Sequence, residues 1–484
     1  MAKRTAIIDI GSNSVRMVIF EKTSRFAFHL IHETKSRVRI SEHAYENNNE
    51  LQQPALDRAY NALKEFQLSI TQFQVRKTLC VATSALRDAP NKQAFISKVK
   101  KELGLHIKVI DGKKEALLGG ISSANLLNLN TALTIDIGGG STELAYYENK
   151  KVIHTTSLNL GTVRLKELFF DKQDLQGAKQ YILNEFKKLP TELQHEDIVG
   201  IGGTLRALSK MVMEREKAEF KKLHGFSYKL HKQKKYFDEL LHSNEDGLKE
   251  LGVKKERLDI IQPGLLILDL LIKHVGAKRI TTSGVGVREG LFLNDLLRTQ
   301  NNQFPNNFSP SVTNLLDRYT NKKCSESHKK ASHIFELSHE LLGIKQKYKV
   351  LFLYAVKLSQ VGQFIDLYEA NRHGYYLVLN GLNYGFTHKE TVLIATLIRF
   401  QGKKLPSNLH MQKYKGYLPS NETVNALCLL NTLTQVLFSD FNHGKDLKIH
   451  MKDKTLCIEV KNSYLLQERL KEVLKNKILD IKLT

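Results

Sequence analysis

The chain contains little cysteine and no long uninterrupted apolar segment. Its 4 cysteines among 484 residues form no Cys-x-x-Cys pair, so the pattern predicts neither a structural zinc site nor a disulfide framework. Asp9 interrupts the first apolar run early, and Asp269 and Lys273 interrupt the apolar stretch 265–275. We therefore expect no signal peptide, no membrane span, and a cytoplasmic location.

Acidic residues are scarce relative to basic ones. The 50 Asp and Glu face 73 Lys and Arg, which gives a net charge of +23. Such a charge favours an acidic partner, whether nucleic acid, anionic lipid or a phosphate-rich small molecule. No nucleic-acid recognition motif accompanies the charge, so we expect no specific nucleic-acid partner.

What the chain does contain is a near-repeat. Residues 8–14 read Ile-Asp-Ile-Gly-Ser-Asn-Ser, and residues 135–141 read Ile-Asp-Ile-Gly-Gly-Gly-Ser. In each copy an apolar run leads into an Asp, a turn of small residues and a second apolar run, which predicts a strand, a tight loop and a returning strand. Asp9 and Asp136 stand 127 positions apart (136 − 9), so the repeat predicts two similar lobes that face each other across a cleft.

The composition of these loops indicates phosphate chemistry. Backbone N–H groups in a turn of Gly and Ser form a concave nest for phosphate oxygens, and a carboxylate at the strand end can hold a hard cation that phosphate also ligates. The run Gly138 to Gly140 needs a reason such as close backbone approach, because each glycine costs about 0.5–1 kcal/mol relative to Ala in a regular element. A single such loop could be a plain hairpin. The pair favours two loops that share one phosphate chain.

Further segments occur in a recognisable order between about residues 5 and 298. They are Ser12–Arg16, Ala82–Arg87, Ile110–Ala116, Ser141–Leu144, Leu160–Arg164 and Gly200–Thr204. In this order the set resembles the exopolyphosphatase and guanosine pentaphosphate phosphohydrolase (Ppx/GppA) family, a branch of the actin-like superfamily of actin, sugar kinases and chaperone ATPases. The resemblance implies an α/β fold with two actin-like (ribonuclease H-like) lobes around a cleft, followed by a mainly α-helical C-terminal domain.

The resemblance also implies site residues. Glu115 matches the catalytic carboxylate that orients the attacking water, although by itself it could be a helix N-terminal Glu stabilised by the macrodipole. Asp9, Asp136 and Glu143 are the candidate metal ligands, and magnesium is the expected ion because it shares phosphate oxygens with few protein ligands. The candidate phosphate-binding residues are Ser12, Asn13, Ser14, Arg16, Ser84, Arg87, Gly138, Gly139, Gly140, Ser141, Thr142, Gly203 and Thr204. The segment Gly202 to Thr204 matches the place where actin-like ATPases approach the nucleoside, and the sequence leaves open whether it contacts phosphate or guanosine.

The domain organisation follows from length and texture, because 484 residues exceed what one core usually supports. We expect lobe I over 1–124, lobe II over 125–298, a linker over 299–311 and a helical domain over 312–484 that ends in a hairpin and a helix. The last domain resembles HD-type phosphohydrolases, but Ser359 and Gln360 replace the His-Asp pair, so we predict no second metal centre there. His328, His333 and His339 are then expected to be helix-face or core histidines.

These expectations lead to a function and its alternatives. The expected activity is magnesium-assisted, in-line removal of the terminal phosphate from inorganic polyphosphate, guanosine pentaphosphate, or both, by a homodimer. A basic track for longer chains is assigned to Lys210, Arg215, Lys217, Lys221 and Lys222. The alternatives are an ATP-dependent actin-like kinase or ATPase, and a non-catalytic sensor that binds polyphosphate or guanosine tetra- or pentaphosphate.

Overall fold

The computed structural model describes residues 3–190, 193–320, 325–402, 404–438, 448–459, 464–474 and 478–483. The chain divides into two compact units, residues 1–308 and 309–484. Within the described ranges, no helix combines the length and the apolar character needed to cross a bilayer.

The first sheet of unit 1 has five strands. Their order is β3 (Phe28–Ser36), β2 (Val15–Lys22), β1 (Arg4–Ile10), β4 (Lys77–Ala82) and β5 (Ile107–Val109). The pairs β3·β2 and β2·β1 are antiparallel, whereas β1·β4 and β4·β5 are parallel. The central strand β1 is therefore bordered by one antiparallel and one parallel neighbour.

The second sheet of unit 1 repeats this arrangement. Its order is β8 (Lys151–Leu158), β7 (Thr142–Glu148), β6 (Ala132–Ile137), β9 (Asp197–Ile201), β11 (Arg279–Thr282) and the added edge strand β10 (Ser227–Lys229). Strands β8, β7 and β6 pair antiparallel, and β6, β9 and β11 pair parallel. The near-repeat in the sequence is thus a duplicated sheet topology, with β6 in the place of β1.

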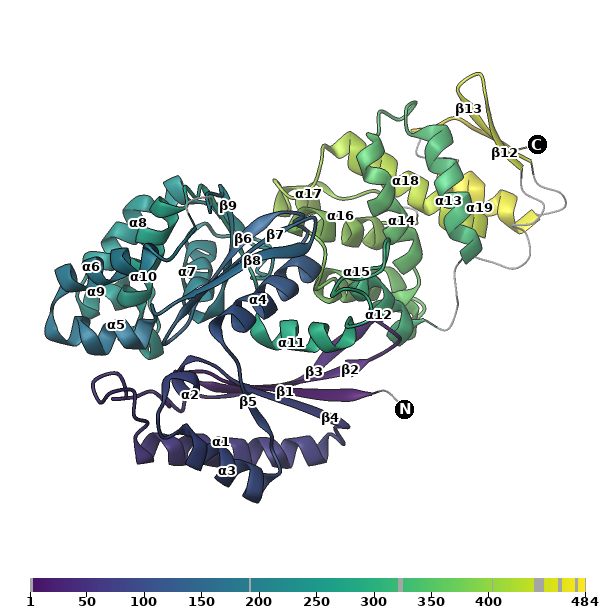
Figure 1. Cartoon of the computed structure of the whole chain (residues 1–484). Coiled ribbons are helices and arrows are strands. Elements are labelled where there is room, and N and C mark those ends of the chain that lie inside the picture. The colour runs from purple at the N-terminus through teal and green to yellow at the C-terminus, as the bar shows by residue number, and fades with distance from the viewer. Residues whose placement is uncertain are drawn as a thin grey trace. The chain divides into compact units, whose positions relative to one another are not determined.

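Eleven described helices accompany the two sheets. They are α1 (Gln53–Gln72), α2 (Ser84–Asp88), α3 (Lys92–Leu103), α4 (Gly112–Leu126), α5 (Thr162–Leu168), α6 (Leu175–Phe186), α7 (Gly202–Arg215), α8 (Leu230–His242), α9 (Glu245–Glu250), α10 (Ile261–His274) and α11 (Val287–Leu296), with 3₁₀ turns at Phe170–Lys172 and Lys255–Arg257. Helices α1 and α3 cover one face of the first sheet, and α11 lies on its other face (Figure 1). Coverage on both faces explains why most of β1 is buried.

In each lobe, the helix that follows the last strand of the sheet packs against the sheet of the other lobe. Helix α4 follows β5 but lies against β7 and β8, where a Cβ at Gly120 would come within 3.0 Å of Ala145 Cβ. Helix α11 follows β11 but lies against β1 of the first sheet, and its Phe292 ring stacks 4.5 Å from Phe20. The two helices also cross each other at Gly290, whose small size permits backbone contact with Leu118. The crossing joins the two lobes into one unit, and the boundary expected after residue 124 falls inside α4.

Unit 2 is mainly helical. Its elements are α12 (Pro310–Tyr319), α13 (Ser325–Ser338), α14 (Lys349–Leu358), α15 (Ala370–Gly381), α16 (His388–Arg399), α17 (Asn408–Lys413), α18 (Asn421–Phe438), β12 (Lys448–Lys452), β13 (Thr455–Glu459), α19 (Tyr464–Leu474) and β14 (Ile481–Leu483), with 3₁₀ turns at Gln346–Tyr348 and Val361–Phe364. Apolar faces of the helices and of the small sheet share one core. The predicted fold class, two actin-like α/β lobes followed by a mainly helical domain, is confirmed.

Some elements differ from expectation. Helix α12 begins at Pro310, inside the segment 299–311 expected to be a linker, because Ser309 caps the helix and proline suits its first turn. Strand β3 was not predicted, since its polar residues alternate at a sheet edge without an apolar run. The ends of the predicted terminal hairpin and helix, at residues 447, 460, 463 and 475, lie outside the described residues.

Candidate active site

The two near-repeats form the same turn in the two sheets. In the first, the Gly11 amide donates to the Ser14 carbonyl at 3.2 Å, and in the second the Gly138 amide donates to the Ser141 carbonyl at 2.9 Å. Both turns join antiparallel neighbours, β1 to β2 and β6 to β7. The sequence repeat is therefore also a repeat of loop geometry.

The strand register gives the two copies opposite charges. Asp9 pairs with Arg16 across the first hairpin, and Asp136 pairs with Glu143 across the second. Equivalent positions thus carry a guanidinium in one lobe and a carboxylate in the other. The duplicated frame therefore has diverged in charge at this position.

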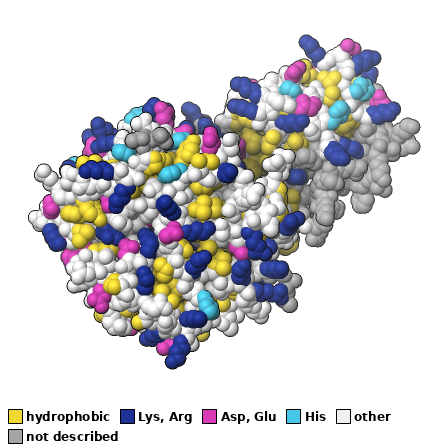
Figure 2. Space-filling view, in the orientation of Figure 1, with side chains coloured by type: hydrophobic (Ala, Val, Ile, Leu, Met, Phe, Trp, Pro, Cys, Tyr) yellow, Lys and Arg dark blue, Asp and Glu magenta, His cyan; other side chains and the backbone are white. Residues whose placement is uncertain are grey.

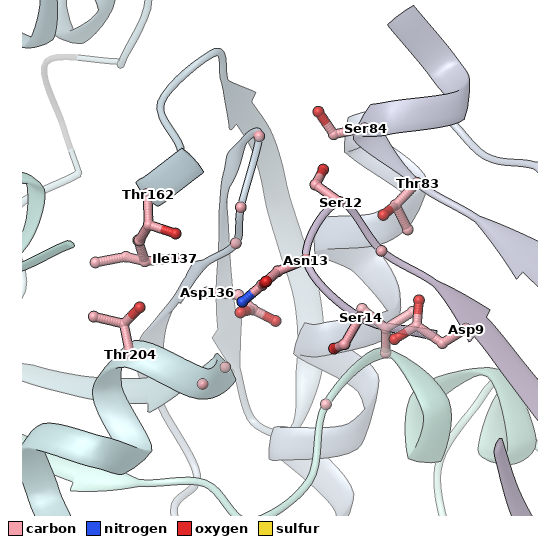
Figure 3. A pocket seen from close by; sticks show the side chains of 18 of the residues that line it. Asp9, Ser12, Asn13, Ser14, Thr83, Ser84, Asp136, Ile137, Thr162 and Thr204 are labelled. Atoms are coloured by element: carbon pink, nitrogen blue, oxygen red, sulfur yellow. The ribbon is translucent and has the colours of Figure 1, made fainter. Parts of the chain in front are cut away.

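Both loops line one cavity of about 150 Å³. Figure 3 shows Asp9 and the first loop on one side and Ile137, Thr162 and Thr204 on the other. The predicted residues that line it are Asp9, Ser12, Asn13, Ser14, Arg16, Ser84, Glu115, Asp136, Gly138, Gly139, Gly140, Ser141, Gly203 and Thr204. The structure therefore brings the two aspartates into a shared cleft, as the two-loop hypothesis requires.

Glycine is required where the two loops meet. A Cβ at Gly139 would lie 2.9 Å from Ser12 Cβ, and a Cβ at Gly140 would lie 2.4 Å from Ser84 Oγ. Such contacts are shorter than carbon and oxygen atoms tolerate, so a side chain at either position would push the loops apart. The close backbone approach accounts for the glycine run of the second loop.

Helix α4 carries Glu115 into the cleft. The Asp111 side chain caps the helix by accepting from the Lys114 amide at 2.6 Å, so Glu115 falls in the first turn. Arg87 Nη1 donates to Glu115 Oε2 at 3.1 Å, and Arg87 Nη2 donates to Ser141 Oγ at 3.3 Å. Arg87, which does not line the cavity itself, thus ties the carboxylate to the second loop.

Two buried carboxylates stand close together beside this loop. Burial raises the pKa of Glu115 well above its usual range, the nearby Glu143 raises it further, and Arg87 opposes the rise. Burial likewise raises the pKa of Glu143 to about 7, and Ser157 Oγ donates to Glu143 Oε1 at 2.9 Å. Because two adjacent anions in a low-dielectric site repel, this arrangement favours a bound proton or cation.

The two loop aspartates are also poorly compensated. Burial raises the pKa of Asp136 to about 6 despite the opposing charge of Arg206, and it raises the pKa of Asp9 despite Arg288 and Arg16. Neither carboxylate accepts a side-chain hydrogen bond from the described residues that line the cavity. Both therefore have oxygen lone pairs free for a hard cation.

The three candidate metal ligands differ in their relation to the cavity. Asp9 and Asp136 line it, whereas Glu143 does not. In the described part of the chain, no group of three or more His, Cys, Asp or Glu is arranged to hold a metal ion. The two aspartates fit a cation such as Mg²⁺ that keeps several waters and binds through one or two protein oxygens.

A basic wall of the cleft went largely unpredicted from the sequence. Besides Arg16, the cavity is lined by Lys35, Arg206, Arg257 and Arg288. Burial and neighbouring cations lower the pKa of Lys35 to about 8, and burial lowers the pKa of Arg206 to about 10. Five cations that line one cavity favour an anionic ligand.

Hydrogen bonds and an ion pair hold two of these basic side chains in position. Arg206 lies one turn into α7 and donates to the Ser283 carbonyl at 2.8 Å, and Arg288 in the first turn of α11 pairs with Glu33 at 2.8 Å. Both arginines follow small-residue turns, after Gly202 and Gly286. A glycine turn that leads into a helix with an early Arg is the sequence signal that could have found them.

The structure distinguishes Thr142 from the other predicted loop residues. Thr142 is fully buried, and its hydroxyl donates to the Leu160 carbonyl at 2.6 Å, so its side chain does not reach the cleft. Gly202, from the predicted segment Gly202 to Thr204, lines the cavity with φ +80, and a Cβ there would lie 2.2 Å from Asp136 Oδ1. Its neighbour Gly203 leaves room for Arg257, whose Nη2 would be 2.6 Å from an added Cβ.

In the helical unit, Ser359 and Gln360 occupy the positions at which an HD-type protein has its His-Asp metal pair. Ser359 is buried, and its hydroxyl donates to Gln435 Oε1 at 3.1 Å, while Gln360 precedes a 3₁₀ turn. His333 contacts the Ile449 carbonyl and His339 the Ile344 carbonyl, each at 3.1 Å. These two histidines therefore have backbone partners; the side chain of His328 lies outside the described residues.

Geometry and charge together define a class: a two-lobed α/β protein whose cleft is lined by two glycine-serine loops, buried carboxylates and a basic wall. The sequence profile of the Ppx/GppA phosphatase family matches residues 18–299, and that of Ppx/GppA phosphatase domain III matches residues 309–477. The chain belongs to the Ppx/GppA phosphatase family.

Solved structures are similar to about three fifths of the chain. The Ppx/GppA family member of Aquifex aeolicus is 27% identical, with a TM-score of 0.53 over 62% of this chain and 99% of that chain. An exopolyphosphatase from Cytophaga hutchinsonii is 23% identical, with a TM-score of 0.56 over 61% of this chain and 98% of that chain. At that identity the second likeness concerns the fold.

Proposed function

We propose that this protein is a magnesium-dependent phosphohydrolase that removes the terminal phosphate of inorganic polyphosphate, guanosine pentaphosphate, or both. The observation that carries the proposal is the placement of Glu115, which Arg87 holds beside the second of two phosphate-type loops in one cavity. Family membership supports a phosphatase, and one protein of similar fold, from Cytophaga hutchinsonii, is an exopolyphosphatase.

The residues divide the work among three tasks. Backbone amides and hydroxyls of the loops 11–14 and 138–141 bind the terminal phosphoryl group, and Arg16 neutralises its charge. Glu115 orients and deprotonates the attacking water. Asp9 and Asp136 would hold Mg²⁺, which would neutralise phosphate oxygens when bound.

A second cavity favours a nucleotide as one substrate. It has a volume of about 240 Å³ and shares Arg16, Gly203, Arg206 and Arg257 with the first cavity. Its remaining wall includes the apolar side chains of Ala207, Met211, Leu223, Val253 and Ile261. An apolar pocket next to a basic phosphate site suits a nucleoside whose phosphates enter the main cleft, and it would also accept the adenosine of an ATP-dependent enzyme.

The expected track for long polyphosphate is only partly supported. Lys210 lines the second cavity, but Arg215 stacks over the Tyr236 ring at 4.7 Å, and neither Lys217, Lys221 nor Lys222 lines either cavity. Basic side chains are scattered over the visible face of the molecule (Figure 2). Dimerisation through the helical unit stays a prediction.

The test is phosphate release from long-chain polyphosphate, guanosine pentaphosphate and ATP, each with and without Mg²⁺. The Glu115→Gln variant should lose release by roughly 10²–10⁴-fold, the usual contribution of a general base, while it still binds substrate. Glu102→Gln, on the exposed surface of α3, is the matched control. A protein that binds these anions but releases no phosphate would instead be a sensor, and release from ATP alone would favour the ATPase alternative.

A further inference from the structure

A cluster of ion pairs lies at the rim of the cleft. Arg37 Nη2 lies 3.2 Å from Asp259 Oδ1, and Arg39 Nη2 lies 2.5 Å from Asp259 Oδ2. The two arginines follow β3 in the first lobe, whereas Asp259 belongs to the second lobe, beside Ile260, which lines the cavity. One carboxylate therefore neutralises part of the charge of two arginines where the lobes meet.

The rim continues the basic wall of the cavity. The pKa of Lys35 is lowered first by burial and then by Arg16, Arg257 and Arg37, so each of these three arginines lies within electrostatic reach of Lys35. Arg16, Lys35 and Arg257 line the cavity, and Arg37 does not. Positive charge thus extends from the interior of the cleft to Arg37 and Arg39 at the surface.

The segment that carries these arginines is tied to the first phosphate loop. The Arg39 amide donates to the Asn13 carbonyl at 3.1 Å, and the Ser41 amide donates to the Ser12 carbonyl at 3.3 Å. The backbone of Arg39 is therefore fixed independently of Asp259. Arg39 Nη1 also lies 3.6 Å from Glu42 Oε1, so a contact from its own segment keeps the guanidinium beside the cleft if Asp259 is displaced.

We propose that Arg37 and Arg39 form an outer phosphate subsite at the cleft rim, and that Asp259 gates this subsite by occupying both guanidiniums when no ligand reaches them. The inference rests on the proposed function, because it assigns the phosphates that follow the reacting end. Their shared chemistry is that of phosphoanions; the source is either the next units of a polyphosphate chain or a second phosphate group of a nucleotide.

Displacement of the gate is feasible because the groups are only partly buried. The side chains of Arg37, Arg39 and Asp259 are 30%, 37% and 27% exposed, and ion pairs at such positions add little net stability. Arginine forks suit bidentate contact with phosphate oxygens at least as well as with a carboxylate. A ligand that already occupies the inner cleft brings its next phosphates to the rim at high effective concentration.

The test measures by calorimetry the binding of tripolyphosphate, long-chain polyphosphate and guanosine pentaphosphate. A chelator is present so that the ligands are not hydrolysed during the titration. The double variant Arg37→Gln/Arg39→Gln should lose about tenfold more affinity for the longer ligands than for tripolyphosphate. Asp259→Asn should gain several-fold for the longer ligands and bind them with a steeper salt dependence. Asp197→Asn is the charge-matched control. It breaks a comparable two-bond pair with Arg279, at the end of β9 that is remote from the cavity.

The outcomes separate the possibilities. A change confined to long-chain polyphosphate identifies the chain as occupant, and one confined to guanosine pentaphosphate identifies the nucleotide. Equal losses for all three ligands, or no gain in Asp259→Asn, would overturn the subsite and leave these residues as an interlobe contact. Thermal melts distinguish lost binding from lost folding. The charge-preserving Arg39→Lys variant should keep the salt dependence but lose part of the selectivity, because lysine cannot make the bidentate contact. Failure of the proposed hydrolysis would show instead as absent phosphate release with ligand binding intact.

Discussion

Replacement of Glu143 by Gln should stabilise the protein at alkaline pH, although it removes a group of the candidate site. Glu143 is 3% exposed, and burial raises its pKa from 4.5 to about 7. Between these two values the folded protein holds a proton that the unfolded chain has released, so stability falls as pH rises through this window. Above pH 7 the folded state carries the full cost of a buried carboxylate.

The size of the effect follows from the shift. A difference of about 2.5 units corresponds to about 3 kcal/mol at 1.36 kcal/mol per unit, and most of it develops between pH 5 and pH 8. Gln keeps the size and the Ser157 hydrogen bond but has no proton to lose. We therefore compare the free energy of unfolding of Glu143→Gln with that of the parent at each pH. The difference, variant minus parent, should be about 2–3 kcal/mol larger at pH 8 than at pH 5.

The assay is chemical denaturation at the two pH values with a chelator and without phosphate, since a bound cation or ligand would compensate the charge. Glu148→Gln on the same strand, with an exposed side chain, is the control and should show no pH-dependent gain. A Glu143→Gln variant that is equally stable, or less stable, at pH 8 than the parent would refute the argument that this carboxylate is strained by burial.

Three further predictions concern other parts of the molecule. Arg87→Ala should move the acidic limb of the pH-rate profile upward by about one to two units, because Arg87 holds the pKa of Glu115 down and activity requires the carboxylate; Arg87→Lys should move it less, and an unmoved limb would contradict the pairing. Because Lys35 has a pKa of about 8 and binds anions only when protonated, affinity for tripolyphosphate should fall about tenfold between pH 7 and pH 9 relative to the Lys35→Arg variant; parallel pH profiles of the two proteins would count against it. Gly290→Ala should destabilise unit 1 by about 1–3 kcal/mol or more in urea denaturation, since its Cβ would lie 1.9 Å from the Leu118 carbonyl oxygen; an unchanged midpoint would mean that the helices separate easily.

The loops were predictable because their pattern is local. An apolar strand, an Asp, a glycine-serine turn and a second strand lie within about a dozen consecutive residues, and the repetition of that pattern implied a shared cleft. Alternation along a strand would also have separated Ser141 from Thr142, since neighbouring residues point to opposite faces. Of these two residues only Ser141 lines the cavity, whereas the hydroxyl of Thr142 donates to the Leu160 carbonyl.

The basic wall could not be predicted in the same way. Lys35, Arg206, Arg257 and Arg288 come from four separate segments, and only tertiary packing brings them to Arg16. In sequence each is one of 73 basic residues, and only Arg206 and Arg288 carry a local signal, the glycine turn that precedes their helices. The pKa shifts of the carboxylates depend on burial, which the sequence suggests only for whole strands.

The crossing of α4 and α11 has an implication for the origin of the molecule. Each sheet obtains part of its cover from a helix encoded with the other copy. An ancestor with a single copy could have covered both faces of its sheet by exchanging that helix with a second identical chain. This is the arrangement of a domain-swapped homodimer. Gene duplication and fusion would have converted this exchange between molecules into an exchange within one, and freed Arg16 and Glu143 to diverge in charge.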